Sequence, residues 1–320
     1  MSYLDTVHEF YKDKALNPGR DRRYAEGRAF SSLPELHIPE IMQVMDYGCG
    51  TTVHCGEIKA GERILYVGVG GGLEPFLFSY FTRRPRAVLA VDRVPEMLAK
   101  AQENLRLAAE VNPWFQPEFI ELRLGDALSL PVETASVEVA AQNGLFNIFT
   151  QDDLALALGE MHRVLKPGGR LYIADPITTQ ALPSCLCQND ALRARCIAGA
   201  LTLEAYLEKI GGAGFGRIEI RSVKPYRVLE KDRYSLAQDI VLQAVELAAY
   251  KTPVPPDGAS VFRGETLLYF GTKELLDSGE GHVLWRNIPL PVSQKTADEF
   301  RKNPREGVTV TEPTFHYGSR

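Results

Sequence analysis

Hydrophobic residues in this chain fall into short runs that alternate with longer segments of helical spacing. Between residues 61 and 175 the short runs are rich in β-branched and other apolar residues and predict strands, whereas the longer segments predict helices. This alternation is typical of a parallel sheet with helices on both faces. We expect strands at 63–68, 87–92, 118–124, 137–142 and 170–175, and helices at 72–81, 95–111 and 151–165.

Outside this region the pattern is less regular. It predicts helices at 2–14, 36–45 and 203–210 and a strand at 216–223; residues 239–249 are apolar at helical spacing, and 261–271 and 281–285 resemble strands. The predicted fold class is α/β, a Rossmann-like, doubly wound, mostly parallel sheet of seven strands. We expect three parts: an N-terminal helical cap segment (1–60), a ligand-binding domain (61–229) and a small C-terminal α+β extension (230–320).

Composition narrows the range of partners. The 320 residues are 45% hydrophobic and 24% charged, which is ordinary for a globular protein. A formal charge of −5 gives no electrostatic reason to expect nucleic acid or an anionic membrane as a partner. The chain has no apolar run of the roughly 20 residues that a membrane-spanning helix needs, and five unevenly spaced cysteines do not suggest a disulfide scaffold. We therefore expect a cytoplasmic enzyme.

A glycine cluster follows the first expected strand and precedes a helix. Glycine permits positive φ and close approach of a ligand, and the N-terminus of a helix attracts an anionic group. Asp92, twenty residues after Gly72, ends the next strand, where its carboxylate is placed to accept both hydroxyls of a ribose. The sequence therefore predicts a nucleoside-binding loop made by Gly68, Gly70, Gly71 and Gly72.

The spacing of these glycines distinguishes between nucleoside ligands. In the dinucleotide fingerprint G-x-G-x-x-G, the third glycine would be Leu73 or Pro75, so the fingerprint is not satisfied. Asp126 follows the third expected strand, where a carboxylate can accept the exocyclic amine of an adenine. One acid for ribose, one for adenine and a helix N-terminus for a small carboxylate favour S-adenosylmethionine over NAD.

Residues 61–223 resemble the class I S-adenosylmethionine-dependent methyltransferases. The resemblance makes Gly68–Gly72 the cofactor loop, Asp92 the ribose acid and Gly125-Asp126-Ala127 the adenine motif, and it places Asn143 beside the transferable methyl group. Tyr66 departs from the pattern, because many members carry an acid there that supports the cofactor's amino group. The cofactor-binding residues implied are Tyr66, Gly68, Gly70, Gly72, Asp92, Arg93, Met97, Gly125, Asp126, Ala127 and Asn143.

A narrower resemblance concerns the methyl acceptor. Segments 47–50, 196–201 and 225–227 look like arsenite methyltransferases, and 1–11, 286–291 and 314–317 look like the cyanobacterial branch associated with arsenosugar synthesis. In that family, cysteines hold trivalent arsenic beside the methyl group. Cys49 and Cys196 match two of those positions and are the catalytic residues implied, whereas Gly144 stands where the family has a third cysteine.

Trivalent arsenic is soft and prefers thiolate ligands. We interpret Cys49 and Cys196 as its ligands, with Cys185 and Cys187 as further candidates, and expect arsenite carrying glutathione or another thiol as the small-molecule partner and no resident metal. Two alternatives stay open: a quinone or phenol acceptor, for which His162 or His54 would be the general base, and a non-catalytic S-adenosylmethionine-binding relative.

Overall fold

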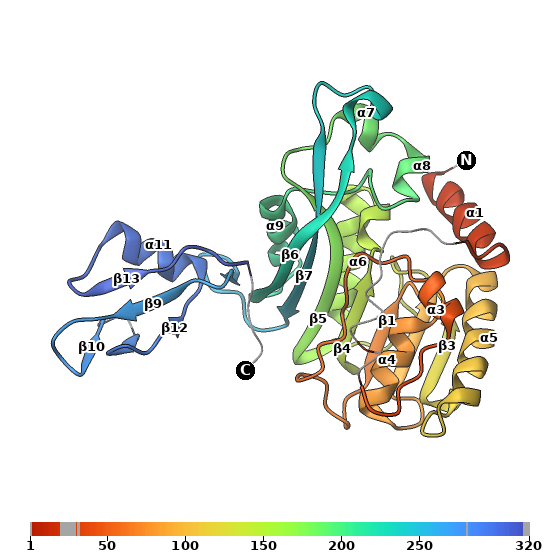
Figure 1. The fold of residues 1–320 in the computed structure, drawn as a ribbon, viewed down its shortest axis with the longest axis horizontal. Helices are drawn as coiled ribbons and strands as arrows, with labels where there is room; N and C mark the ends of the chain where they lie inside the picture. Colours follow the sequence, from red (N-terminus) through yellow and green to blue (C-terminus); the bar gives the residue numbers. More distant parts are fainter. Residues whose placement is uncertain (1, 20–29, 31–32, 280, 316–320) are drawn as a thin grey trace.

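Our description rests on a computed structural model that describes residues 2–19, 30, 33–279 and 281–315 (Figure 1). Met1 and residues 316–320 lie outside the described residues, so the family-like patterns at 1–11 and 314–317 are described only in part. Within the described residues, no helix is both long and apolar enough to cross a bilayer.

The centre of the fold is an eight-stranded sheet in the order β3-β2-β1-β4-β5-β7-β6-β8. The first five of these strands are parallel, β7 is antiparallel to β5 and β6, and β8 is parallel to β6. The predicted Rossmann-like α/β class is confirmed, but the sheet has eight strands rather than seven because short β8 joins its edge. The bounds are β1 Ile64–Val67, β2 Val88–Asp92, β3 Ile120–Leu124, β4 Val137–Asn143, β5 Leu165–Thr178, β6 Arg217–Leu229, β7 Ile240–Tyr250 and β8 Ser260–Phe262.

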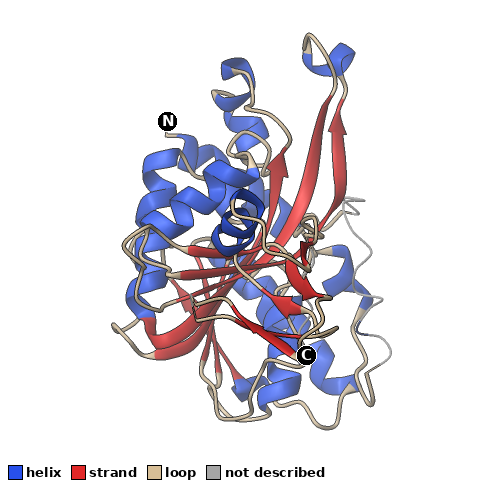
Figure 2. Ribbon diagram, turned by 90° about the vertical axis from the view of Figure 1, so that its left-hand side faces the viewer, coloured by secondary structure: helices blue, strands red, loops and turns tan. Residues whose placement is uncertain are grey.

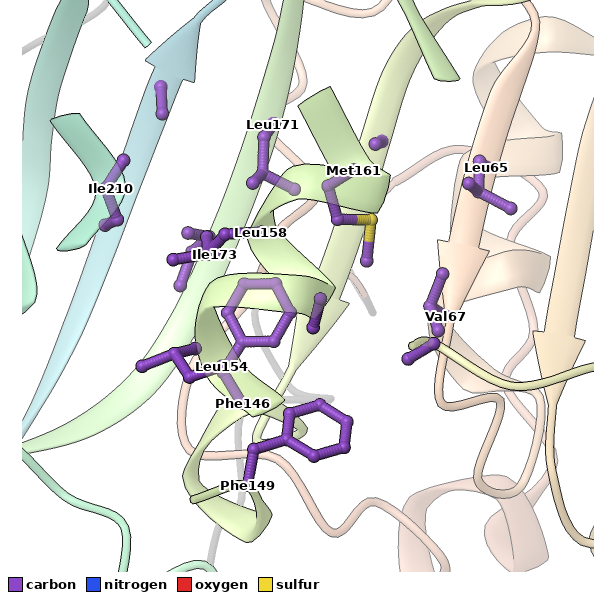
Figure 3. Packing of buried hydrophobic residues seen from close by; sticks show 14 of the residues in the cluster. Leu65, Val67, Phe146, Phe149, Leu154, Leu158, Met161, Leu171, Ile173 and Ile210 are labelled. Carbon is purple, nitrogen blue, oxygen red and sulfur yellow. The ribbon is translucent and has the colours of Figure 1, made fainter. Parts of the chain in front are cut away.

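Alternate residues of β1 enter two different cores because side chains alternate across a strand. Leu65 and Val67 pack on one face with α6 (Gln151–Val164) and α9 (Leu203–Gly212), as Figure 3 shows for α6. Ile64 and Tyr66 pack on the other face with α4 (Leu73–Thr82) and α5 (Pro95–Val111). Helices therefore cover both faces of the sheet (Figure 2), and the loops at the carboxyl ends of the parallel strands are left to build a site.

The remaining helices are short, except α1. Ser2 is the N-cap of α1 and forms a capping box there. Near the end of the long β6–β7 hairpin, α7 and α10 join a small cluster of buried side chains (Figures 1 and 2). The bounds are α1 Tyr3–Leu16, α3 Glu40–Val44, α7 Ser184–Cys187, α8 Asp190–Arg193, α10 Lys231–Tyr234 and α11 Gln294–Lys302, with 3₁₀ turns η1 Pro117–Phe119 and η2 Phe146–Ile148.

Residues 240–250 form strand β7, so the helical spacing at 239–249 does not correspond to a helix. β7 lies between β5 and β6, and Leu242, Val245 and Leu247 are fully buried. A strand buried on both faces carries a continuous apolar run, and such a run cannot be told from a buried helix by periodicity alone.

The C-terminal part has its own small core of Leu267, Tyr269, Leu284, Val292 and Phe300. Because β7 and β8 belong to the main sheet, this part begins after β8 and not at the expected boundary near residue 230. It consists of α11, a three-stranded sheet in the order β12-β9-β13 and a β10–β11 hairpin. The bounds are β9 Thr266–Tyr269, β10 Leu275–Asp277, β11 Val283–Trp285, β12 Leu290–Pro291 and β13 Val308–Val310.

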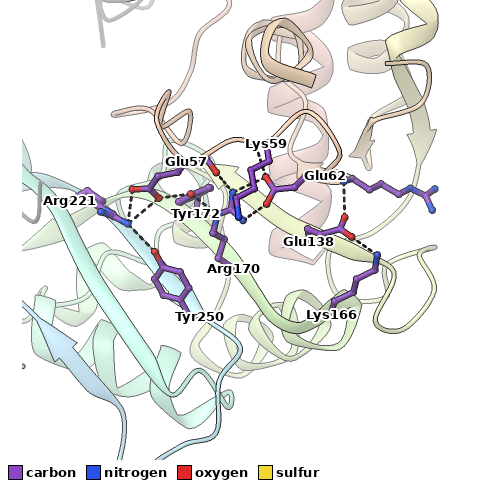
Figure 4. Close-up of polar contacts among 10 residues, drawn as sticks. Glu57, Lys59, Glu62, Glu138, Lys166, Arg170, Tyr172, Arg221 and Tyr250 are labelled. Atoms are coloured by element: carbon purple, nitrogen blue, oxygen red, sulfur yellow. Dashed lines mark hydrogen bonds and ion pairs between the residues drawn. The ribbon is translucent and has the colours of Figure 1, made fainter. Parts of the chain in front are cut away.

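Ion pairs join the segment before β1 to strands β5 and β6 (Figure 4). Arg170 on β5 donates to both carboxylate oxygens of Glu62, at 2.7 and 2.9 Å, and both side chains are nearly buried. Arg221 on β6 lies 2.9 Å from Glu57 and 2.6 Å from Glu219. Such pairs contribute little net stability, but loss of one partner leaves an uncompensated buried charge.

Replacing Glu62 by alanine should therefore lower the free energy of unfolding by about 3–5 kcal/mol. Lys166, which pairs with Glu138 at the surface, is the control: its replacement by alanine should cost less than about 1 kcal/mol. Urea denaturation of both variants and the parent measures the difference. Equal losses of unfolding free energy in the two variants would show that the Arg170–Glu62 pair matters no more for stability than the surface pair.

Candidate functional site

The glycine loop connects β1 to α4 and requires its glycines. Gly68, Gly70 and Gly72 have φ of +83°, +53° and +87°, which side chains with a Cβ rarely adopt. Gly72 is the N-cap of α4, and a Cβ there would lie 3.5 Å from the Cβ of Ala101 on α5. Gly72 is therefore required by its backbone conformation at the start of α4, whereas Gly68 and Gly70 also face the pocket described below.

Two side chains hold the loop. The Asp92 carboxylate accepts from the Val69 N–H at 2.8 Å and, through its other oxygen, from the Val94 N–H at 2.9 Å. Burial raises the pKa of Asp92, and these backbone donors oppose that rise by favouring the ionised form. On α5, the Asn104 amide donates to the Gly71 carbonyl at 2.9 Å.

A pocket of about 1000 Å³, including its open mouth, lies where β1, β2 and β4 end. Of the eleven predicted cofactor-binding residues, it brings together all except Gly72. The sequence singled them out separately, and they meet because the carboxyl ends of parallel strands share one edge of the sheet. Those ten are Tyr66, Gly68, Gly70, Asp92, Arg93, Met97, Gly125, Asp126, Ala127 and Asn143.

The charges around the pocket favour a cationic ligand over a pyrophosphate. Among the described residues that line it, four carry a carboxyl group and one a guanidinium: Asp46, Glu74, Asp92, Asp126 and Arg93. An acidic lining attracts the sulfonium and ammonium groups of S-adenosylmethionine and repels the phosphates of a dinucleotide. The residues present therefore fit S-adenosylmethionine.

Asp126 and Arg93 lie together at the rim. The Arg93 Nε is 3.7 Å from one Asp126 oxygen, and the other oxygen accepts from the Leu128 N–H at 2.9 Å. Both residues are partly exposed, so this ion pair contributes little and can open for a ligand. Gly125 is needed for packing, because a Cβ there would lie 2.6 Å from Pro131.

Sequence reasoning missed two acids near Tyr66, which occupies a position where many class I members have an acid. Glu74, in the first turn of α4, accepts from the Thr52 hydroxyl at 2.6 Å, and burial raises its pKa. Asp46 also lines the pocket, and its charge contributes to the raised pKa of Tyr66, whose main cause is burial. Asp46 thus supplies a carboxylate beside the glycine loop, from a segment that has no recognisable motif.

Helix α1 covers the pocket, which its amphipathic pattern alone did not reveal. Leu4, Val7, His8 and Tyr11 of α1 line the pocket. Lys12 lies 3.8 Å from Glu96 on α5, so α1 is also anchored to the helix that holds the glycine loop. Entry to the pocket therefore involves α1.

Beside the pocket, residues 48–50 pack against the turn after β4. The Asn143 side chain accepts from the Cys49 N–H at 2.9 Å and donates to the Gly50 carbonyl at 2.7 Å. From the other side, the Cys196 thiol donates to the Gly144 carbonyl at 2.7 Å. Gly144 has φ of +75°, and a Cβ there would lie 3.9 Å from the Cys196 sulfur.

Cys49 and Cys196 are thus gathered around one turn, although they do not themselves line the pocket. Their exposed fractions are 1% and 3%, so both lie directly behind the lining residues Gly48, Asn143 and Gly144. Neither forms a disulfide.

Other candidates do not line this pocket. Cys185 and Cys187 lie on α7; the first is exposed and the thiol of the second donates to the Leu182 carbonyl at 3.6 Å. His54 packs on Tyr172, and His162 at the end of α6 packs on Phe215. Burial lowers the pKa of both histidines. The structure does not place either histidine as a general base at this pocket.

A buried carboxylate supports the same turn from below. Asp175 on β5 accepts from the Tyr206 hydroxyl at 2.6 Å and from the Gln142 amide at 2.5 Å. The Gln142 oxygen in turn accepts from the Leu145 N–H at 2.7 Å. Burial raises the pKa of Asp175 to about 7, and these hydrogen bonds oppose the rise. No local motif marked Asp175, because its burial depends on packing between β5, β4 and α9.

Asp175 should make stability depend on pH. Its pKa is about 7 in the fold against an ordinary value of 3.8, so between about pH 4 and pH 7 the folded chain binds more protons than the unfolded chain. Stability therefore falls as pH rises through this window. Asp175→Asn removes this titration. The free energy of unfolding of the variant, relative to that of the parent, should therefore increase by up to about 4 kcal/mol between pH 4 and pH 7.

Urea denaturation of both proteins at several pH values measures this gain, and a stability difference that stays constant with pH would contradict it.

Comparison with known proteins agrees with this geometry. Residues 65–173 match the methyltransferase domain family. An arsenite methyltransferase of Halobacterium salinarum is 32% identical over 173 residues, which are 54% of this chain and 42% of the relative. One from Aquipseudomonas alcaligenes is 30% identical over 207 residues, or 62% of this chain and 57% of the relative. The chain thus spans about half the length of these curated relatives.

Among solved structures, the fold is similar to an arsenic(III) S-adenosylmethionine methyltransferase from Chlamydomonas reinhardtii. The TM-score is 0.59 at 21% identity, and the match covers 89% of this chain and 97% of the other. At this identity the likeness shows the fold alone.

Proposed function

We propose that this chain, which contains a class I S-adenosylmethionine-dependent methyltransferase domain and resembles arsenite methyltransferases, transfers a methyl group to trivalent arsenic held by Cys49 and Cys196. The observation that supports the proposal is that the Cys49 backbone N–H and the Cys196 thiol both bond to the turn after β4, directly behind the pocket lining. The curated relatives named above are arsenite methyltransferases, which supports the choice of acceptor.

The pocket residues bind and orient the cofactor. Asp92 would accept the ribose hydroxyls and Asp126 the adenine amine, and buried Met97 would lie beside the base; all three line the pocket. Asp46, which also lines the pocket, would neutralise the ammonium group in place of the acid that Tyr66 replaces. S-adenosylmethionine supplies a methyl group already activated by its positive sulfur. Helix α1 excludes water from the pocket, which strengthens these electrostatic contacts.

The thiols hold and orient the acceptor. Thiolates bind soft trivalent arsenic and leave its lone pair available. That lone pair forms the new arsenic–carbon bond while the electron pair of the carbon–sulfur bond stays on the departing thioether. No proton moves in this step, so no general base is required. Holding the reacting atoms in alignment lowers the activation barrier, by up to about 7–11 kcal/mol in favourable cases.

Gly144 limits the protein to two thiolates at this turn. A Cβ at Gly144 would lie near the Cys196 sulfur, which is where a third thiolate would complete the arsenic ligand set. We infer that the third ligand comes with the substrate, as a small thiol such as glutathione or as a methyl group already on arsenic.

Variants of Cys49 and Cys196 test this function. With arsenite and glutathione, Cys49→Ser and Cys196→Ser should each lower the rate of arsenic methylation at least about 100-fold, because one thiolate alone does not retain arsenic. Chromatographic arsenic speciation measures the products. Exposed Cys55 is the control, and Cys55→Ser should leave the rate unchanged.

Cofactor binding separates the outcomes. Calorimetry with S-adenosylhomocysteine should give the same affinity for the parent and both thiol variants, because neither cysteine lines the pocket. A parent that binds the cofactor product but forms no methylated arsenic would refute the arsenic acceptor and leave an organic acceptor or a non-catalytic role.

A further inference from the structure

Helix α1 touches the Cys196 turn at two points. At one end of the helix, the Arg193 guanidinium lies over the Tyr3 ring at 5.3 Å, and the Tyr3 hydroxyl donates to Asp153 on α6. Two turns along, the Tyr11 hydroxyl lies 3.6 Å from the Cys196 sulfur. Tyr11 also lines the cofactor pocket, so one side chain contacts both the pocket and a thiol.

The backbone fixes where the Cys196 sulfur can point. Cys196 has φ of +57°, a left-handed conformation that is unfavourable for a residue with a Cβ. It is held by hydrogen bonds from the Cys196 N–H to the Arg193 carbonyl at 2.9 Å and from the Ile197 N–H to the Leu192 carbonyl at 3.0 Å. Strain of this kind persists where the surroundings impose it and is common at functional sites.

Two of the contacts of the Cys196 sulfur suit two different protonation states. The bond to the Gly144 carbonyl, at 2.7 Å, needs a thiol proton, because a carbonyl oxygen only accepts. A thiolate would be repelled by that oxygen, but it can accept from the Tyr11 hydroxyl.

We propose that Tyr11 is a positioning residue for the Cys196 thiolate, an inference that rests on the proposed role of Cys196 as an arsenic ligand. When the thiol proton leaves to solvent, the sulfur exchanges the Gly144 carbonyl for the Tyr11 hydroxyl. Because the Tyr11 side chain also lines the pocket, this exchange holds the thiolate against the pocket wall, where the acceptor would lie.

Tyr11→Phe tests this by removing only the hydroxyl while keeping the ring against Tyr47. Cys196 is made the only thiol by replacing the other four cysteines with serine, and its ionisation is followed by ultraviolet difference absorbance against pH. The midpoint should rise by about one to two pH units in Tyr11→Phe, since a hydrogen bond to an ionised group is lost. Tyr3→Phe is the matched control on the same helix and should leave the midpoint unchanged.

An unchanged midpoint in Tyr11→Phe would overturn the proposal. Because the four-serine background removes buried Cys49, a second measurement keeps Cys49 and Cys196 and titrates phenylarsine oxide by intrinsic fluorescence at a pH below the midpoint. Tyr11→Phe should bind about tenfold more weakly than the parent there, and equal binding would also count against Tyr11. If the midpoint shifts while the parent fails to methylate arsenite, the proposed function fails and the contact between Tyr11 and Cys196 stands.

Discussion

The packing of residues 48–50 against the turn after β4 is the interaction on which the site depends. It requires two glycines, for different reasons. A Cβ on Gly48 would lie 2.3 Å from the Asn143 side chain, and Gly144 has φ of +75°, which residues with a Cβ rarely adopt. Asn143 then bonds to both Cys49 and Gly50. One amide side chain thus joins a segment without regular structure to the carboxyl end of β4 in the central sheet.

This contact brings two chemistries together. On one side of the turn lies an acidic pocket suited to a cationic nucleoside, and on the other lie two buried thiols. The supports beneath the turn, Asp175 and Gln142, come from β5 and β4, and the helix above it is α1. The sheet is therefore a general scaffold, and the proposed acceptor site is made by the segments that surround the end of β4.

How much of this could be predicted from the sequence depends on how local each signal is. Asp92 ends a strand, and Gly68 and Asp126 each follow one within a few residues. The pattern that predicted the strands therefore also placed these residues at one edge of the sheet. Asp46 and Tyr11 could not be placed in this way. They reach the pocket through tertiary packing of segments before the sheet. β7 was misread because its burial on both faces hides the alternation that marks a strand.

We propose that one turn links the cofactor pocket and the thiol pair. A crystal structure of the protein with S-adenosylhomocysteine and phenylarsine oxide tests this claim most directly. We expect ribose hydroxyls on Asp92, the thioether sulfur beside Asn143 and Gly144, and arsenic bonded to the sulfurs of both Cys49 and Cys196. Arsenic bound at Cys185 and Cys187, away from the thioether, would contradict it.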